Sequence, residues 1–340
     1  MNPAAAERSS PAGENAPAPA TIAIVVSYNS APHLGPCLAS LEAQHGVSPC
    51  IYLIDNASSD KSVELVRREF PRVRVLENAR NVGFARANNQ VLEQETTEFY
   101  ALVNPDAVVH PDAMRTCVDY LKRDPKAGVA ATRLVFPDGT LQRSCHSFLG
   151  LRNLLGETLG IHRLIPGLRS FASFHLPWFD YDRAGEVDWI VGAFLVIRGE
   201  VVRTVGGFDP EFFMYGEEMD WCRRIHRAGW KVVYLPAPPV MHVGGASSAP
   251  VAGPMFVENL KGRVRFLQKH RGPFVAAAAR GVIALSVLLR YAWREARALG
   301  LSLVGRRAEA SLRTEQIMFR SAIRWVLRGL PLSPQGTDGL

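Results

Sequence analysis

The sequence is poor in cysteine and contains no CxxC pair. Its 340 residues include only five cysteines, at positions 37, 50, 117, 145 and 222. An odd, scattered set of this kind argues against a disulfide framework and against a cysteine-based zinc site. We therefore expect free thiols and a reducing, cytoplasmic compartment.

Two phosphate-binding signatures are also missing. No GxGxxG follows the first predicted strand, and GxxxxGK[ST] does not occur in the chain. Dinucleotide oxidoreductases and P-loop enzymes use these glycines to bring the backbone close to phosphate groups. Their absence weakens both classes of function.

The first twenty residues lack a continuous apolar segment. They are rich in Ala and Pro and carry Glu7, Arg8 and Glu14. A secretory signal needs an apolar core of at least about seven residues, so none is predicted here. The low hydrophobicity instead predicts a disordered leader over residues 1–20.

Charge is divided unevenly between a body and a tail. The chain has a net charge of +7. Residues 256–340 hold 15 Lys or Arg and 5 Asp or Glu, a net charge of +10, so residues 1–255 carry a net charge of −3. Such a basic tail predicts an anionic partner. Nucleic acid is disfavoured, because Trp293 and Trp325 lie too far apart to form a stacking platform. An anionic membrane fits better, since the basic residues flank an apolar stretch.

That apolar stretch is Phe274–Leu289, with Arg280 near its middle. A membrane-spanning helix needs about 20 mostly apolar residues. We therefore expect an interfacial amphipathic helix within a basic, helical, membrane-associating region over residues 256–330. A C-terminal helix that simply packs on the rest of the protein is the alternative.

Apolar runs alternate with amphipathic segments over the first half of the chain, which predicts a mostly parallel sheet flanked by helices, an α/β fold. The ligand edge of such a sheet lies beyond the carboxyl ends of its strands, where Ser27–Asn29, Asp55–Ser59 and Asn104–Asp106 are expected. Residues 137–186 are expected to form an irregular insertion or lid. The predicted strands are Thr21–Ser27, Cys50–Ile54, Val73–Leu76, Phe99–Val103, Val129–Val135, Val187–Arg198 and Lys231–Leu235, and the predicted helices are Pro32–Gln44, Lys61–Phe70, Asn81–Glu95, Pro111–Arg123 and Glu217–Gly229.

An acidic and aromatic cluster leads into the last of these helices. Residues 206–220 hold five carboxylates and four aromatic rings. Crowded carboxylates repel, and burying one is costly unless a cation or a proton-transfer role offsets the cost. This cluster therefore suggests a metal-assisted transfer enzyme that acts on a phosphorylated donor.

Helical spacing separates the carboxylates of this segment. Glu218 heads a stripe with Trp221, Cys222, Ile225 and Gly229, so it is expected to point into the protein. It is either a general base or a carboxylate that only interacts with the helix dipole, and Glu217 is ambiguous. Asp220 precedes Arg223 and Arg224 by three and four residues, which predicts a surface salt bridge.

A second acidic turn, Asn104-Pro105-Asp106, follows an apolar strand. It is either an ordinary turn, which all three residues favour, or a site for Mg²⁺ or Mn²⁺ on a diphosphate, since hard cations prefer oxygen ligands. His242 lies just past another strand in a glycine-rich turn, and it is either structural or a further ligand.

The order of these motifs resembles that of family 2 glycosyltransferases with a GT-A fold, and most closely their rhamnosyltransferase-like branch. The resemblance extends over residues 24–247. It rests on Ile24-Val25-Val26-Ser27-Tyr28-Asn29-Ser30, Asp55-Asn56-Ala57-Ser58, Asn81-Val82-Gly83-Phe84-Ala85, Asn104-Pro105-Asp106-Ala107, Gly206-Gly207-Phe208-Asp209, Glu217-Glu218-Met219-Asp220 and His242-Val243-Gly244-Gly245.

The resemblance implies a role for each matching residue. It implies that Glu218 is the catalytic base, in place of the usual Asp, with Glu217 as the alternative. It implies a divalent cation, Mg²⁺ or Mn²⁺, held by Asp106, Asn104 and His242. Nucleotide contacts are implied for Ser27, Asn29, Asp55, Asn56, Asn81, Gly83 and Asn88, and a donor-sugar and acceptor pocket for Trp189, Phe208 and Asp209.

The resemblance further implies an inverting glycosyltransferase domain over residues 21–250. The implied donor is dTDP-L-rhamnose, and the implied acceptor is a cell-surface glycan or a polyprenyl-linked saccharide. A UDP- or GDP-sugar donor is the alternative, and a catalytically inactive sugar-nucleotide-binding or scaffold protein is another. With the basic tail, these expectations place the enzyme in the cytoplasm at the inner face of the cell membrane, with no nucleic-acid partner.

Overall fold

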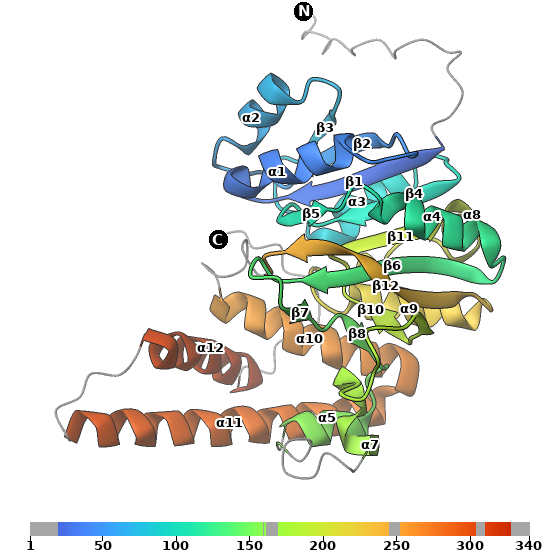
Figure 1. Cartoon of the computed structure of the whole chain (residues 1–340). Helices are drawn as coiled ribbons and strands as arrows, with labels where there is room; N and C mark the ends of the chain where they lie inside the picture. Colours follow the sequence, from blue (N-terminus) through green and yellow to red (C-terminus); the bar gives the residue numbers. More distant parts are fainter. Residues whose placement is uncertain (1–19, 159, 161–168, 245–251, 304–309, 328–340) are drawn as a thin grey trace, which may run out of the picture.

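The computed structural model describes residues 20–158, 160, 169–244, 252–303 and 310–327. The predicted leader therefore lies almost entirely outside the described residues. A central sheet with helices on both of its faces forms the upper body in Figure 1, and three long C-terminal helices lie beneath it. This arrangement confirms the predicted α/β class.

The main sheet has the strand order β3-β2-β1-β4-β11-β6-β12-β5. Neighbouring strands from β3 to β4 are parallel, as are β6 and β12, whereas β11 is antiparallel to both of its neighbours. Its strands are β1 (Thr21–Ser27), β2 (Cys50–Asp55), β3 (Arg74–Glu77), β4 (Phe99–Val103), β5 (Ala107–Val109), β6 (Ala127–Val135), β11 (Phe194–Arg198) and β12 (Lys231–His242).

Alternating side chains of β1 serve two separate cores. Ala23 and Val25 face one side of the sheet, where α1 (Ala31–Glu42), α2 (Ser62–Glu69) and α4 (Ala113–Arg123) pack. Ile22 and Ile24 face the other side, which α3 (Phe84–Leu92), α8 (Gly199–Val205) and α9 (Glu217–Arg227) cover. This period of two is the geometry of a strand buried on both faces.

The segment predicted as an irregular insertion is built from short elements. They are β7 (Leu141–Gln142), β8 (Cys145–His146), α5 (Leu151–Thr158), α7 (Arg169–Ala172), the 3₁₀ turn η1 (Ser173–His175) and β9 (Gly185–Glu186). The predicted strand Val187–Arg198 is split, because only β10 (Trp189–Ile190) and β11 are extended, and β10 pairs with β8 in a separate small sheet.

The C-terminal region is helical, as predicted, but it is not separate from the body. It consists of α10 (Ala252–Arg271), α11 (Pro273–Leu303) and α12 (Ala310–Leu327). A third hydrophobic cluster joins Met219 of α9 and Leu154 of α5 to Val264 of α10 and Ile283 of α11. The boundary predicted near residue 256 therefore cuts through a continuous core.

Two predictions about individual helices were wrong, one on the exposure of Asp220 and one on the length of an apolar helix. Asp220 does form the expected ion pair with Arg224, but its side chain is fully buried rather than on the surface, because α10 covers it.

The apolar run near Phe274 was expected to be too short to span a membrane. The helix continues beyond Leu289, however, and its 24-residue stretch Pro273–Ala296 is long enough and apolar enough to cross a membrane, judged by length and composition alone.

Candidate functional site

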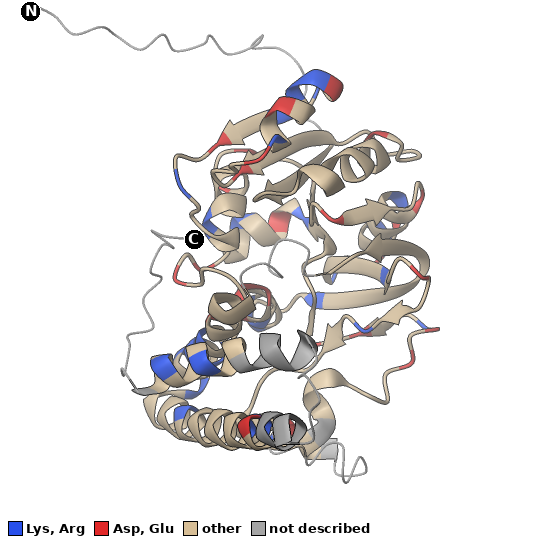
Figure 2. Cartoon of the chain, turned by 90° about the vertical axis from the view of Figure 1, so that its left-hand side faces the viewer, with Lys and Arg blue, Asp and Glu red and all other residues tan. Residues whose placement is uncertain are grey.

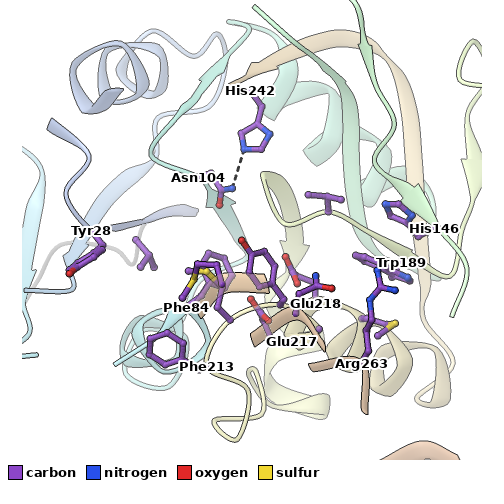
Figure 3. A pocket seen from close by; sticks show the side chains of 18 of the residues that line it. Tyr28, Phe84, Asn104, His146, Trp189, Phe213, Glu217, Glu218, His242 and Arg263 are labelled. Carbon is purple, nitrogen blue, oxygen red and sulfur yellow. Dashed lines mark hydrogen bonds between the residues drawn. The ribbon is translucent and has the colours of Figure 1, made fainter. Parts of the chain in front are cut away.

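A cavity of about 430 Å³ opens at the carboxyl edge of the sheet. Figure 3 shows that side chains from distant parts of the sequence converge on it. Val26 lies near the end of β1, Tyr28 follows β1, Asn56 follows β2, and Asn104 follows β4, as expected for ligand sites in such sheets.

Two of the residues predicted to contact a nucleotide, Asn56 and Asn81, line this pocket. The side-chain amide of Asn56 donates to the Gly83 carbonyl, 3.3 Å away, and the Asn81 side chain accepts from the Gly83 amide at 3.0 Å. Gly83 has a φ of +87°, and a Cβ there would lie 2.4 Å from the Phe213 carbonyl oxygen. Only glycine fits this contact.

The other predicted nucleotide residues do not line the pocket, and several of them hold neighbouring loops. Asp55 accepts hydrogen bonds from the backbone amide and hydroxyl of Ser58, at 2.8 and 2.5 Å. Asn29 accepts from the Ser59 amide at 2.8 Å, and Asn88 donates to a backbone carbonyl within its own helix. Ser27 is fully buried.

Asn104, Asp106 and His242 come together, as predicted, although 138 residues separate the first from the last. The Nε2 atom of His242 lies 3.2 Å from Asp106 Oδ1 and 3.2 Å from the Asn104 side-chain nitrogen. Strand β12 brings His242 to this place because it pairs with β5, which begins directly after Asp106. Figure 3 shows the Asn104–His242 contact at the pocket rim.

The electrostatics around Asp106 favour an ionised carboxylate. Burial alone would raise its pKa, but the hydrogen bond and charge of His242 and the Gly244 amide lower it overall. The Gly244 amide donates to Oδ2 at 3.0 Å, so Oδ1 is the oxygen that faces His242. His242 Nδ1 lies 2.8 Å from the Gln142 side-chain oxygen, a contact that holds the ring with Nε2 facing Asp106.

These donors fit a hard divalent cation as an open site. One carboxylate oxygen, one imidazole nitrogen and one nearby amide leave several positions for phosphate oxygens and water, which is how Mg²⁺ and Mn²⁺ are commonly bound. The described residues contain no group of three or more His, Cys, Asp or Glu able to hold a metal alone. Any cation here would therefore need the ligand's phosphates.

Glu217 and Glu218 open α9 and both line the pocket. Glu218 Oε1 accepts a hydrogen bond from the Gly192 amide at 3.3 Å, in the break between β10 and β11. Burial raises the pKa of Glu218. Burial raises the pKa of Glu217 well above its ordinary value, and the charge of Glu218 adds to this effect. Among the described residues, buried Glu217 Oε2 has no hydrogen-bond partner.

Of the three predicted sugar and acceptor residues, the structure places only Trp189 on the pocket. Phe208 is buried against Phe84 and Trp221, with ring centroids 5.7 and 4.4 Å away. Asp209 forms an ion pair with Lys269 of α10 at 2.6 Å. Both residues stabilise the packing around α9 instead.

The insertion contributes an aromatic wall that sequence reasoning missed. His146 stacks on Trp189 with a centroid distance of 4.5 Å, and Phe174 and His175 complete the wall. Burial, aided by His175, lowers the pKa of His146 to about 4, so its ring is neutral near pH 7. Only the aromatic content of residues 137–186 could have indicated this surface.

Arg263 of α10 was also missed. It lines the pocket and forms a two-point ion pair with Glu157 of α5, at 2.8 and 3.0 Å. Burial alone would raise the pKa of Glu157, but His175 and Arg263 outweigh it and lower that pKa to about 2. The predicted membrane tail thus supplies a wall of the site, a contribution that charge counting could not reveal.

Comparisons with known proteins agree with this geometry. The family model described as glycosyl transferase family 2 matches residues 22–181. A protein of Mycobacterium tuberculosis named N-acetylglucosaminyl-diphospho-decaprenol L-rhamnosyltransferase is 28% identical over 237 residues, which cover 64% of this chain and 74% of the relative. Rhamnosyltransferase WbbL of Escherichia coli K12 is 26% identical over 181 residues, 51% of this chain and 63% of the relative.

A solved structure shares the fold. It is the mannosyltransferase PcManGT from Pyrobaculum calidifontis in complex with GDP-Man and Mn²⁺, with a TM-score of 0.52, 17% identity, and coverage of 92% of this chain and 88% of that chain. At this identity the match concerns the GT-A architecture alone.

Proposed function

This chain belongs to glycosyl transferase family 2, and we propose that it transfers a sugar with inversion from a nucleotide-diphosphate donor to a saccharide acceptor. The donor we infer first is dTDP-L-rhamnose, because both sequence relatives described above are named rhamnosyltransferases. A UDP- or GDP-sugar is the alternative donor. The acceptor we infer is a cell-surface glycan or a polyprenyl-linked saccharide, since the Mycobacterium relative is named for a decaprenol-linked one.

One observation carries the proposal. A single pocket brings Glu218 together with the Asp106–His242 pair, and Asn56 and Asn81 also line it. A base, a diphosphate site and a nucleotide site within one cavity are the parts that a single-displacement transfer needs. The aromatic wall around Trp189 adds a surface on which a sugar ring can pack.

In this mechanism, Glu218 takes the proton from the acceptor hydroxyl while that oxygen attacks the anomeric carbon. The bond from the anomeric carbon to the diphosphate breaks on the opposite face, and its electron pair leaves with the diphosphate. General-base catalysis of this kind contributes roughly 10²–10⁴-fold. The Gly192 amide orients the carboxylate, and burial raises its pKa, which makes it a stronger base once ionised.

Asp106 and His242, with Asn104, would hold a divalent cation against the donor phosphates. When bound, such a cation neutralises charge on the leaving diphosphate. The open donor set predicts that cation and nucleotide bind together rather than separately.

A nucleotide panel tests the proposal. The full chain is heated with dTDP, UDP, GDP or CDP, each with and without Mn²⁺ or Mg²⁺, because a ligand that binds only the native state raises the melting temperature. A cation-dependent shift with dTDP supports a rhamnosyl donor, whereas a shift with UDP or GDP alone changes the donor. No shift with any nucleotide would overturn the proposed function.

A further inference from the structure

Helix α11 is apolar on two opposite sides. Its inner side, which includes Ala276, Ala279, Ile283 and Val287, is buried in the hydrophobic cluster shared with α10 and α12. Figure 1 shows α11 at the lower end of the molecule, with α10 and α12 above it and α5 beside it at the same height. The other side therefore faces outward along the length of the helix.

The outer side of α11 carries an exposed apolar stripe. Its residues recur every three or four positions, as one face of a helix does. Phe274 is 89% exposed, Leu289 is 56% exposed and Trp293 is 69% exposed. We call the following set the outer stripe: Phe274, Ala277, Ala278, Gly281, Leu285, Leu288, Leu289, Ala292, Trp293 and Ala296. A continuous patch of this kind on a soluble surface marks an interaction site.

We propose that the outer stripe docks flat on an anionic lipid membrane and holds the catalytic pocket at the membrane surface. This inference rests on the proposed function only in giving the docking a purpose, the capture of a lipid-linked acceptor. Phe274 and Trp293 lie near opposite ends of the stripe, where large aromatic side chains suit the boundary between headgroups and acyl chains.

Charge favours a membrane over an apolar protein partner. Arg280 is exposed on α11, and residues 256–340 as a whole hold 15 Lys or Arg against 5 Asp or Glu. Arg290 and Arg294 lie on the inner side instead, since the Arg290 guanidinium donates to the Thr158 carbonyl of α5 and the Arg294 guanidinium lies 4.8 Å from the Phe319 ring centre of α12. Figure 2 shows Lys and Arg concentrated over the C-terminal helices. Each basic group near an anionic surface adds to its attraction.

The contacts on the inner side of α11 argue against a helix that crosses the membrane. Ser286 donates to the Thr158 carbonyl at 3.2 Å, and Arg290 donates to it at 3.0 Å, both from the inner side of α11 to α5. Crossing the bilayer would separate α11 from α5 and expose the core around Ile283. An interfacial position leaves all of these contacts intact.

Docking in this orientation has a consequence for the acceptor. Helix α10 leads directly into α11 through Gly272, and its residues Met255, Asn259 and Arg263 line the pocket. Figure 1 shows α10 between the sheet and α11. A saccharide held on a lipid would therefore reach the pocket from the α10 side.

Vesicle flotation of the full chain tests the proposal. The unmodified protein should float with phosphatidylglycerol/phosphatidylcholine vesicles and less with phosphatidylcholine alone. Leu285→Glu/Leu289→Glu should weaken partitioning into vesicles by about a hundredfold, because the variant no longer buries these two exposed leucine side chains in the membrane. The matched control is Phe136→Glu/Trp178→Glu, which changes two exposed apolar residues away from α11 and should float like the unmodified protein.

The remaining outcomes overturn the proposal. Unchanged flotation of the leucine variant, or equal loss in the control, would remove the outer stripe as the docking surface. A dimer in sedimentation without lipid that the leucine variant makes monomeric would assign the stripe to a second copy of the chain. Retention of the unmodified protein in membranes after alkaline carbonate washing would show a spanning helix. Flotation needs no catalysis, so these results are independent of the proposed activity.

Discussion

The Asp220 carboxylate lies 2.8 Å from His270 Nε2 and joins the helix of the two pocket glutamates to the C-terminal helix α10. Its oxygens also lie 2.8 Å from Lys269 Nζ and 2.9 Å from Arg224 Nε. Burial alone would raise the pKa of Asp220, but the bonds from His270 and Lys269 lower it to about 2. One buried carboxylate thus fixes α10 beside the site.

We predict that Asp220→Asn destabilises the protein by about 3 kcal/mol near pH 7, since it removes a buried carboxylate charge that Arg224, Lys269 and His270 contact. Because the folded-state pKa is depressed below the ordinary 3.8, the ionised carboxylate stabilises the fold above that pH and loses this effect as the pH falls toward about 2. Urea unfolding should show a constant difference in the free energy of unfolding between the unmodified protein and Asp220→Asn from neutral pH to about pH 5. This difference should narrow below pH 3.8. A difference that widens on acidification would contradict this assignment.

Gly262 permits the closest approach between α10 and the loop before α9. A Cβ at this position would lie 2.0 Å from the Tyr215 carbonyl oxygen, which cannot move without shifting Gly216 and the start of α9. We predict that Gly262→Ala lowers both the melting temperature and kcat. The matched control is Gly281→Ala in α11, where a Cβ meets nothing within 4 Å. This control should keep its activity and gain up to about 1 kcal/mol of stability from helix propensity. Equal behaviour of the two variants would show that the contact is unimportant.

The sequence predicted much of the site because parallel strands bring their carboxyl ends to one edge. Asn56, Asn104 and Glu218 all follow local patterns, namely a strand end or a helix start, and all line the pocket. The pairing of Asp106 with His242 needed the family resemblance, since no local pattern shows that β12 runs beside β5.

The rest depended on contacts between distant elements. Arg263 looked like one more charge in a basic tail, and only the fold places it against Glu157. Asp220 looked like a surface residue because helical spacing shows its arginine neighbour but not the helix that covers it. His146 lies in a segment without periodicity, where the sequence gives no orientation for a side chain.

The Asp106 carboxylate should be the source of any cation dependence. We predict that Asp106→Asn abolishes the Mn²⁺-dependent part of the thermal shift produced by the preferred nucleoside diphosphate, because a neutral amide is a weaker ligand than a carboxylate. The Asp55→Asn variant is the comparison, since Asp55 bonds Ser58 and does not line the pocket, so it should affect nucleotide binding with and without Mn²⁺ alike. A full Mn²⁺ effect in Asp106→Asn would place the cation elsewhere.

The two adjacent glutamates should separate cleanly by mutation. We predict that Glu218→Gln lowers kcat by roughly 10²–10⁴-fold while nucleotide binding is retained, because the amide keeps the shape but cannot accept a proton. Glu217→Gln should keep most of the activity, since burial raises the pKa of Glu217 and so favours its uncharged form, which glutamine resembles. If Glu217→Gln loses activity as severely as Glu218→Gln, the base has been assigned to the wrong residue.

The pH dependence of the melting temperature should also distinguish Glu217 from Glu218. A raised folded-state pKa means that the unfolded chain ionises first, so Glu217 destabilises the fold increasingly as the pH rises above the ordinary value of 4.5. Glu217→Gln should therefore raise the melting temperature at pH 7.5, and this gain should vanish below pH 4.5. Glu217→Ala is the control, because it removes the buried acid but leaves a cavity beside the pocket. The raised pKa of Glu218 should appear separately, as an acidic limb of kcat/KM that lies above 4.5 and that Glu217→Gln leaves in place.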